Sequence, residues 1–302
     1  MKLIALRVRN ILNAQQPREQ AGFRKSFSTM DHLHTINQII EKAREYQLKI
    51  HFAFIDYTKA FDSLSHQYLL KTLNNQGIPS SIIKIIERVY SNLRARIVTD
   101  QRGRNFNVEK GIKQGDPLSS LIFISALEGV FRELEWKNKG LIINGEKISN
   151  LRFADDVVLI STDVEELNTM VSELNEKGKE AELEMNVKKC KIMSPEKHID
   201  IEIDGQKIEV SEVEYLGQLL DFENATTKEV NKRITLAWKK FWSLKIILKG
   251  PFSNYHKSQI FNSCIIPTLS YGAQTWALTK KKRKQTESNT KLNGAGYAGY
   301  KS

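Results

Sequence analysis

Two adjacent aspartates stand between two apolar runs of this chain. Asp155 and Asp156 follow residues 151–153 and precede the β-branched run 157–160, a pattern typical of a tight β-hairpin turn. Like charges held together need a cation to offset their repulsion, and carboxylate oxygens are ligands that Mg²⁺ prefers. An isolated Asp-Asp pair is also common in solvated turns. The pair alone therefore leaves a metal site and an ordinary turn both open.

A third aspartate favours the metal site. Asp56 ends the apolar run 50–55, which predicts a strand. If this strand lies beside the hairpin, the three carboxylates can hold two Mg²⁺ ions about 3.5–4 Å apart, an arrangement that clamps the attacking and leaving oxygens of phosphoryl transfer. Such chemistry needs positioning and charge neutralisation rather than covalent catalysis, and we find no catalytic His or Cys constellation in the sequence.

Six segments then follow one another in the order of a known family's motifs. They are a fingers motif at 20–31, motif A at 54–62, motif B at 111–119, motif C at 153–156, motif D at 186–191 and motif E at 214–217. In these segments the chain resembles the reverse transcriptase domain of non-LTR (LINE-type, RTE-like) retrotransposons. A thumb segment at 266–272 extends the resemblance, which covers residues 20–280.

The resemblance implies an α+β, right-hand polymerase fold with a palm, partial fingers and a helical thumb. We expect partial fingers at 1–50, a palm at 51–220 with fingers-side helices and a hairpin at about 64–112, and a thumb at 221–280. Residues 281–302 are expected to form a basic, disordered tail. Because the match begins within the family's fingers and departs from it near the C-terminus, we expect a chain truncated at both ends.

Local patterns predict the elements that carry these motifs. Apolar periodicity predicts helices at 32–46, 65–76, 81–92 and 163–183. Asp116 and Pro117 suit the cap and first turn of a further helix. Strand pairs are expected around Gly103 and Gly145 and within 199–220. Thr226 and Glu229 have the spacing of a capping box at the start of a thumb helix.

The charge of the chain is uneven. Residues 226–302 hold 15 Lys and Arg against 2 Asp and Glu, a net charge of +13, whereas the whole chain carries +11 and residues 1–225 therefore sum to −2. A basic C-terminal lobe favours nucleic-acid binding, although a basic surface without a partner is the alternative. The run 280–284 fits a nuclear-import signal, a phosphate-binding patch or a solvated segment.

Composition limits the cellular setting. No run of 18 or more apolar residues occurs, so we expect no membrane segment. Cys190 and Cys264 are far apart in sequence and predict reduced thiols of an intracellular protein. We expect the protein in the nucleus, the cytoplasm or both.

The resemblance also implies roles at the metal site. Asp56 and Asp155 would ligate both Mg²⁺ ions, with Mn²⁺ as a possible substitute, and Asp156 would assist. The backbone carbonyl of Tyr57 would also approach a metal.

Tyr57 and five further residues are expected around the nucleotide. Arg24 would grip the triphosphate, and Lys189 would act there as a proton donor. Gln114 and Gly115 would lie against the incoming nucleotide and the template, and Phe61 would exclude a ribose 2′-hydroxyl. Each has a plainer alternative, namely a core phenylalanine, helix-entry geometry, or a solvated charge.

Four basic residues are expected to contact nucleic acid from the thumb. Lys232, Arg233, Lys239 and Lys240 lie within about two and a half turns of one helix. We expect them to line a strip beside the primer–template duplex, with Leu236 and Trp242 facing inward.

The predicted function is an RNA-directed DNA polymerase that uses an RNA template, a DNA primer and dNTPs. RNA synthesis on the same palm is an alternative that Phe61 argues against. A non-catalytic, RNA-binding remnant is the second alternative, favoured by the partial fingers and the basic thumb. The sequence leaves the oligomeric state open.

Overall fold

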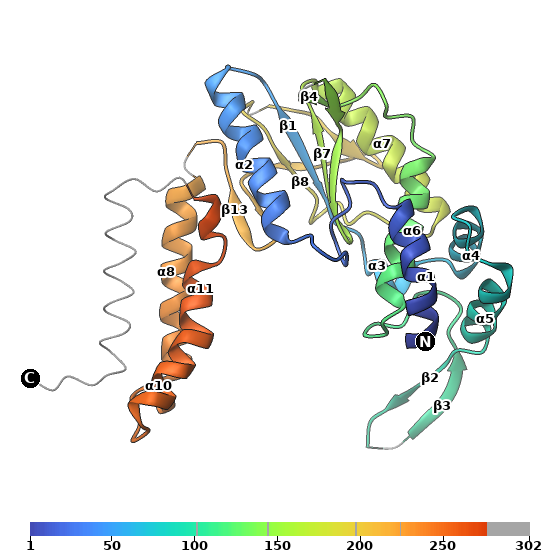
Figure 1. The fold of residues 1–302 in the computed structure, drawn as a ribbon. Helices are drawn as coiled ribbons and strands as arrows, with labels where there is room; N and C mark the ends of the chain where they lie inside the picture. Colours follow the sequence, from blue (N-terminus) through green and yellow to red (C-terminus); the bar gives the residue numbers. More distant parts are fainter. Residues whose placement is uncertain (101, 144, 197, 224, 277–302) are drawn as a thin grey trace, which may run out of the picture. The chain divides into compact units, whose positions relative to one another are not determined.

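A computed structural model (Figure 1) describes residues 1–276 apart from 101, 144, 197 and 224. The chain divides into two compact units, the first formed by Met1–His32 and Ile40–Val213 and the second by Leu33–Ile39 and the chain from Glu214 onward. The division falls between residues 213 and 214 rather than at the palm–thumb boundary of 220 and 221, and the segment 1–32 belongs to the first unit. The predicted tail 281–302 and the basic run 280–284 lie outside the described residues.

A five-stranded sheet forms the centre of the first unit, in the order β11-β8-β1-β7-β6. Its strands are β11 (Glu209–Val210), β8 (Lys191–Met193), β1 (His51–Ile55), β7 (Asp156–Ser161) and β6 (Asn150–Phe153). The central strand β1 is antiparallel to both β7 and β8. All five of its residues are buried, which explains why the run 50–55 is apolar without alternation. The sheet therefore joins motifs that are distant in the sequence.

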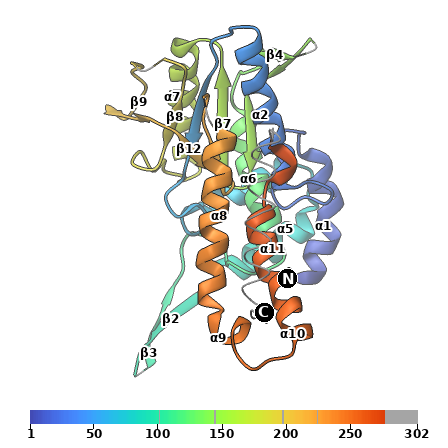
Figure 2. The ribbon, with the colours of Figure 1, turned by 90° about the vertical axis from the view of Figure 1, so that its left-hand side faces the viewer.

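Helices surround this sheet (Figures 1 and 2). They are α1 (Lys2–Gln15), α3 (Ala60–Ser63), α4 (His66–Asn75), α5 (Ser80–Ser91), α6 (Ser119–Arg132) and α7 (Val164–Glu180), and α2 (Thr29–Glu45) contributes to both units. The helices predicted from periodicity are confirmed to within a few residues. Helix α7 packs on β1 and β7, and α6 packs on α1, α4 and α7. Thus α6, the helix of motif B, lies at the centre of the helical layer.

Short hairpins complete the first unit. They are β2 (Arg94–Val98) with β3 (Arg102–Asn107), β4 (Leu141–Ile143) with β5 (Glu146–Ile148), and β9 (Glu202–Ile203) with β10 (Gln206–Lys207). The strand pairs predicted around Gly103 and Gly145 are confirmed. β12 (Val213–Tyr215) pairs with β13 (Gln218–Leu220) at the start of the second unit. The β2–β3 hairpin extends away from the neighbouring helices in both views (Figures 1 and 2).

The second unit is mainly helical. It contains α8 (Ala225–Ser243), α9 (Lys245–Leu248), α10 (Asn254–Ile260), a π-helical turn η1 (Phe261–Ile265), α11 (Ile266–Ser270) and a 3-10 turn η2 (Ala273–Thr275). Its core consists of Ala237, Phe241, Leu248, Phe261, Ile265 and Leu269. Trp242, which was expected to face inward, is 51% exposed. Among the residues that the structure describes, no helix is long and apolar enough to cross a membrane.

The capping box predicted at Thr226 and Glu229 is wrong. Helix α8 already includes Ala225, so Thr226 lies inside it. Glu229 is fully buried, and its carboxylate accepts hydrogen bonds from the Leu219 backbone N–H (2.8 Å) and from Arg233 Nε (2.5 Å). Glu229 therefore ties α8 to β13 instead of capping the helix.

Candidate active site

The three predicted catalytic aspartates lie at one end of the central sheet. Asp56 directly follows β1, Asp156 is the first residue of β7, and Asp155 is in the turn between β6 and β7. Ile55 lies opposite Val157 in the antiparallel pair, so the next positions along the two strands, Asp56 and Asp156, follow at the same end. Strand register thus brings these carboxylates together.

The turn between β6 and β7, which is the predicted catalytic turn, differs in one detail from the expected Asp-Asp turn. Phe153 pairs with Asp156, so the two central residues are Ala154 and Asp155. Ala154 has a φ of +60°, a left-handed conformation that favours glycine and is strained for alanine by about 1 kcal/mol. A positive φ at the first central position is typical of a II′ hairpin turn. The turn therefore needs support from the surrounding structure.

The segment 19–22 provides that support. The Gln20 side-chain oxygen accepts hydrogen bonds from the backbone N–H groups of Ala154 (3.2 Å) and Gly22 (2.8 Å), and Gln20 is fully buried. A Cβ on Gly22 would lie 2.1 Å from the Ala154 nitrogen, far inside van der Waals contact. The glycine of the fingers motif is thus required because this segment lies directly against the catalytic turn.

We predict that Gly22→Ala lowers primer-extension activity at least tenfold, because the new methyl group must displace either the 19–22 segment or the catalytic turn, and small misplacements of reacting groups are costly. Steady-state extension by the purified variant, with a thermal melt, measures this. Lys25→Ala, a change at a nearby exposed side chain, is the control. Full activity of the glycine variant would show that the contact is not important for catalysis.

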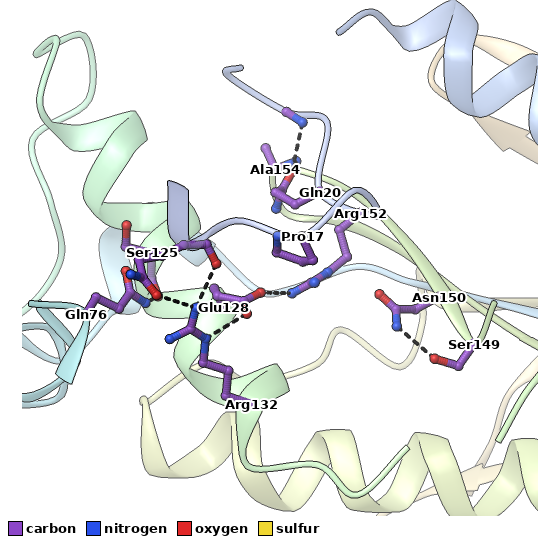
Figure 3. Close-up of polar contacts among 12 residues, drawn as sticks. Pro17, Gln20, Gln76, Ser125, Glu128, Arg132, Ser149, Asn150, Arg152 and Ala154 are labelled. Carbon is purple, nitrogen blue, oxygen red and sulfur yellow. Dashed lines mark hydrogen bonds and ion pairs between the residues drawn. The ribbon is translucent and has the colours of Figure 1, made fainter. Parts of the chain in front are cut away.

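A buried ion pair holds β6, the strand that leads into the turn (Figure 3). Arg152 Nη1 lies 3.0 Å from Glu128 Oε2, and both residues are buried. The guanidinium carbon lies 4.0 Å from the centre of the Phe131 ring. Arg132 Nε donates to the other oxygen of Glu128 at 2.9 Å. Burial lowers the pKa of Arg152, and the carboxylate of Glu128 opposes that change. The charged form of Arg152 is therefore stabilised inside the protein by Glu128.

The backbone of Arg152 fixes the same region. Its carbonyl accepts from the Ala21 N–H (2.9 Å), and its N–H donates to the Glu19 carbonyl (2.8 Å). The edge of β6 is therefore covered by segment 19–21. Gln20, Glu128 and Arg152 were not predicted as supporting residues. One signal was present, because an arginine and a glutamate each stand inside an otherwise apolar run, where a charge needs a partner.

The electrostatics of the aspartates show a strong need for a cation. Partial loss of water around its carboxyl, followed by the charges of Asp155 and Asp56, raises the pKa of Asp156 to about 6, although part of this side chain faces solvent. Loss of water and the charge of Asp56 also raise the pKa of Asp155, while its own backbone N–H and Lys189 oppose the shift. Lys189 Nζ is 3.5 Å from Asp56 Oδ1. The Lys189 ammonium thus pairs with Asp56 and offsets part of the negative charge at Asp155.

The donor set fits a hard divalent cation. Asp56 Oδ1 is buried and accepts no hydrogen bond, so it has a lone pair left for a metal ion. Within the described ranges, no group of three or more His, Cys, Asp or Glu side chains is placed to hold a metal by itself. Mg²⁺ is often bound by one or two carboxylates, with water and substrate phosphates completing its shell. The aspartates therefore suit an ion that also binds a nucleotide.

A pocket of about 500 Å³ brings together three of the residues expected at the nucleotide, Phe61, Gln114 and Gly115. It is lined by Phe23, Phe61, Gln114, Gly115, Asp116, Pro117, Ser119 and Ser120. The Phe61 ring stacks on Phe123, with centroids 4.4 Å apart, and contacts the edge of Phe23 at 6.1 Å. Phe61 is thus held rigidly as part of the pocket wall.

The loop before α6 forms the other side of the pocket. Gly115 has a φ of +83°, which only glycine adopts readily, and Gln114 Nε2 donates to Asp62 Oδ1 at 3.3 Å. Asp116 Oδ1 accepts from the Leu118 N–H at 2.8 Å, but the N-cap of the helix is Leu118, so the predicted cap at Asp116 is wrong. The regular helix begins at Ser119, two residues later than predicted.

Two of the predicted nucleotide contacts, Arg24 and Tyr57, do not line this pocket. Arg24 Nη1 donates to the carbonyls of Pro17 (2.5 Å) and Gln20 (2.6 Å), so this arginine braces its own loop. The side chain of Tyr57 is buried, and burial raises the pKa of its hydroxyl well above the ordinary value. Any contact of Tyr57 with a metal must therefore come from its backbone.

The four basic residues of the thumb helix do not form one exposed strip. Lys239 and Lys240 are exposed, and Lys232 Nζ lies 2.8 Å from a carboxylate oxygen of Glu214. Arg233 is buried, pairs with Glu229 and donates to the Gly217 carbonyl. The placement of Arg233 in a solvent-facing strip is therefore wrong, because its side chain is fully used inside the second unit.

The fold and site define the class of protein. The chain has a right-hand polymerase fold, since it is similar to the structure of apo telomerase from Candida tropicalis with a TM-score of 0.58 and 14% identity, over 98% of this chain and 51% of that one. The family model of the reverse transcriptase (RNA-dependent DNA polymerase) matches residues 1–220. The chain belongs to the reverse transcriptase family, as a domain of the non-LTR retrotransposon type.

Curated relatives agree with this assignment. The chain is 35% identical over 156 residues to the Pol polyprotein of the type-1 retrotransposable element R2 from Nasonia vitripennis, which covers 51% of this chain and 15% of the relative. It is 24% identical over 278 residues to an R2 polyprotein from Popillia japonica, which covers 87% of this chain and 38% of that protein. The chain thus spans well under half the length of these relatives.

Proposed function

We propose that the chain is an RNA-directed DNA polymerase that uses two Mg²⁺ ions, or Mn²⁺ in their place, to join dNTPs to a DNA primer on an RNA template. The observation that supports this most strongly is the convergence of Asp56, Asp155 and Asp156 at one end of the sheet, with raised pKa values at two of them and an unbonded oxygen on the third. Bound ions would supply charge neutralisation and alignment for the in-line transfer.

The residues of this chain have distinct tasks in this proposal. Asp56 and Asp155 would hold the ions, and Asp156 would assist through its neighbouring charge. Lys189, whose Nζ lies 3.5 Å from Asp56, is proposed to donate a proton at the triphosphate. Gln114 and Gly115 line the pocket and are proposed to lie beside the incoming nucleotide.

Phe61 is proposed to select the sugar. Its ring is packed between Phe123 and Phe23, so it cannot easily move aside for a 2′-hydroxyl.

We predict that Phe61→Ala lowers discrimination against rNTPs by about 10–100-fold, the range expected for a steric contact of this size. Incorporation of matched dNTP and rNTP substrates, compared as kcat/KM, measures this. Ser120→Ala, a change elsewhere in the pocket lining, is the control. A wild-type chain that prefers rNTPs would contradict the assignment and favour RNA synthesis.

A catalytically inactive RNA-binding remnant is the second candidate. It is favoured by the exposed Lys239 and Lys240 in a lobe of net charge +13 and by the engagement of Arg24 within its own loop. Primer extension and RNA affinity, measured on the same preparation, separate the two. The polymerase predicts Mg²⁺-dependent extension that Asp155→Asn abolishes. The remnant predicts RNA binding without extension, unchanged when all three aspartates are replaced.

A further inference from the structure

The β2–β3 arm, residues 94–107, is a hairpin outside the core of the first unit. Its two strands pair only with each other, and it extends beyond the neighbouring helices (Figure 2). Ile97 is 67% exposed, Val98 63% and Phe106 51%. Exposed apolar side chains of this size on a projecting hairpin mark an interaction surface.

The arm is also the basic part of an otherwise acidic region. Residues 94–107 contain four arginines and one aspartate, a net charge of +3, whereas residues 1–225 as a whole sum to −2. In the part of the chain that the structure describes, no ion pair joins Arg94, Arg96 or Arg104 to an acidic group, and all three are exposed. Their charges are thus available to a partner.

Strand register sorts these side chains onto two faces. Arg94 pairs with Asn107, and Arg96 pairs with Asn105, so two arginines and two amides share one face. Ala95 pairs with Phe106 on the opposite face. The register shifts between Arg96 and Val98, so that Gly103 and Arg104 together face Ile97. Arginines and amides therefore cover one face of the arm, Phe106 lies on the other, and Arg104 is at the bulge.

This combination of groups matches single-stranded nucleic acid. The guanidinium group of arginine binds phosphate oxygens through paired hydrogen bonds, and an exposed aromatic ring stacks on an unpaired base. A second copy of the chain fits less well, because pairing two arms would bring their arginines together. A-form duplexes offer few unstacked bases, so they leave Phe106 without a partner.

We propose that the β2–β3 arm binds single-stranded RNA that crosses the edge of the hairpin, so that Arg94 and Arg96 hold phosphates on one face, Phe106 stacks on a base on the other, and Arg104 holds a phosphate at the bulge between them. Identifying that strand as the template rests on the proposed function, but the binding itself does not. The test therefore measures binding without nucleotide or metal, so its failure is distinct from a failure of polymerase activity.

The main test removes the three charges from the full chain by Arg94→Gln, Arg96→Gln and Arg104→Gln. Its matched control is Arg7→Gln, Arg9→Gln and Arg44→Gln, which removes three exposed arginines elsewhere. Affinity for a labelled single-stranded RNA is measured across a salt series. We expect the arm variant to bind about tenfold more weakly. A plot of log affinity against log salt concentration should become shallower by about 2, because each lost phosphate contact removes ~0.7 from its slope. An arm variant that behaves like its control would overturn the proposal.

A second variant tests stacking. Phe106→Ala should weaken binding of single-stranded RNA about tenfold while leaving the salt slope unchanged, because base stacking releases no counterions. Binding of a blunt RNA duplex should not respond to this change. Equal losses for the duplex and the single strand, or dissociation of a dimer in sedimentation when the arm is altered, would contradict the proposal. A circular dichroism melt of each variant confirms folding.

Discussion

Asp155→Asn is expected to lower the rate of primer extension by at least ~10³-fold, a loss of about 4 kcal/mol of transition-state stabilisation at 1.36 kcal/mol per factor of ten. The amide keeps the shape of the side chain but removes the charge that holds the metal ions. Asp56→Asn should have a similar effect, because it removes the carboxylate charge that faces Lys189 and that would hold a metal ion.

Asp155→Asn should not lower the free energy of unfolding. A carboxyl whose pKa is raised in the folded state is ionised less readily there than in the unfolded chain, so its ionised form destabilises the protein at neutral pH. The pKa of Asp155 is raised, and the neutral asparagine should leave the Tm unchanged or slightly increased. Asp200→Asn, at an exposed surface pair, is the control. Extension at the wild-type rate by Asp155→Asn would exclude these aspartates from the chemistry.

The second large effect is on stability. Glu128→Ala is expected to lower the free energy of unfolding by about 3–5 kcal/mol, because it leaves the charge of Arg152 buried without its partner. The loss should also reduce extension activity, since β6 leads directly into the catalytic turn. Urea denaturation followed by circular dichroism measures the change.

Two further variants identify the cause. Replacing both partners, as Glu128→Leu with Arg152→Met, should be far less destabilising than Glu128→Ala, because no buried charge remains. Glu180→Ala breaks an exposed ion pair with Lys177 and should cost below about 1 kcal/mol. If Glu128→Ala is no worse than this exposed control, the buried pair does not hold the strand.

The strands that position the aspartates could be predicted because they obey local rules. The apolar run 50–55 and the β-branched run 157–160 each indicate a buried strand, and a carboxylate at the end of each is evident in the sequence. The exact residues of the turn could not be predicted. Ala154 accepts a positive φ only because Gln20, far away in the chain, holds its N–H group.

In the predicted thumb helix, a local sequence pattern led to a wrong prediction. The spacing of Thr226 and Glu229 satisfied a local rule for a helix start, yet Glu229 is used by Arg233 four residues later and by the backbone of β13. An i, i+4 acid–base pair was visible in the sequence, but its burial depends on tertiary contacts of Arg233 with Gly217 and Tyr271. Charge count alone could not separate this arginine from the exposed Lys239 and Lys240.

Single-nucleotide addition on RNA templates that differ only at the first templating base tests the central claim most directly. The purified chain, a DNA primer, Mg²⁺ and one dNTP at a time are sufficient. The account predicts that each template directs the addition of its complementary dNTP, that the matching rNTP is added poorly, and that Asp56→Asn adds neither. A folded chain that binds the primed template but adds no nucleotide in either Mg²⁺ or Mn²⁺ would contradict it.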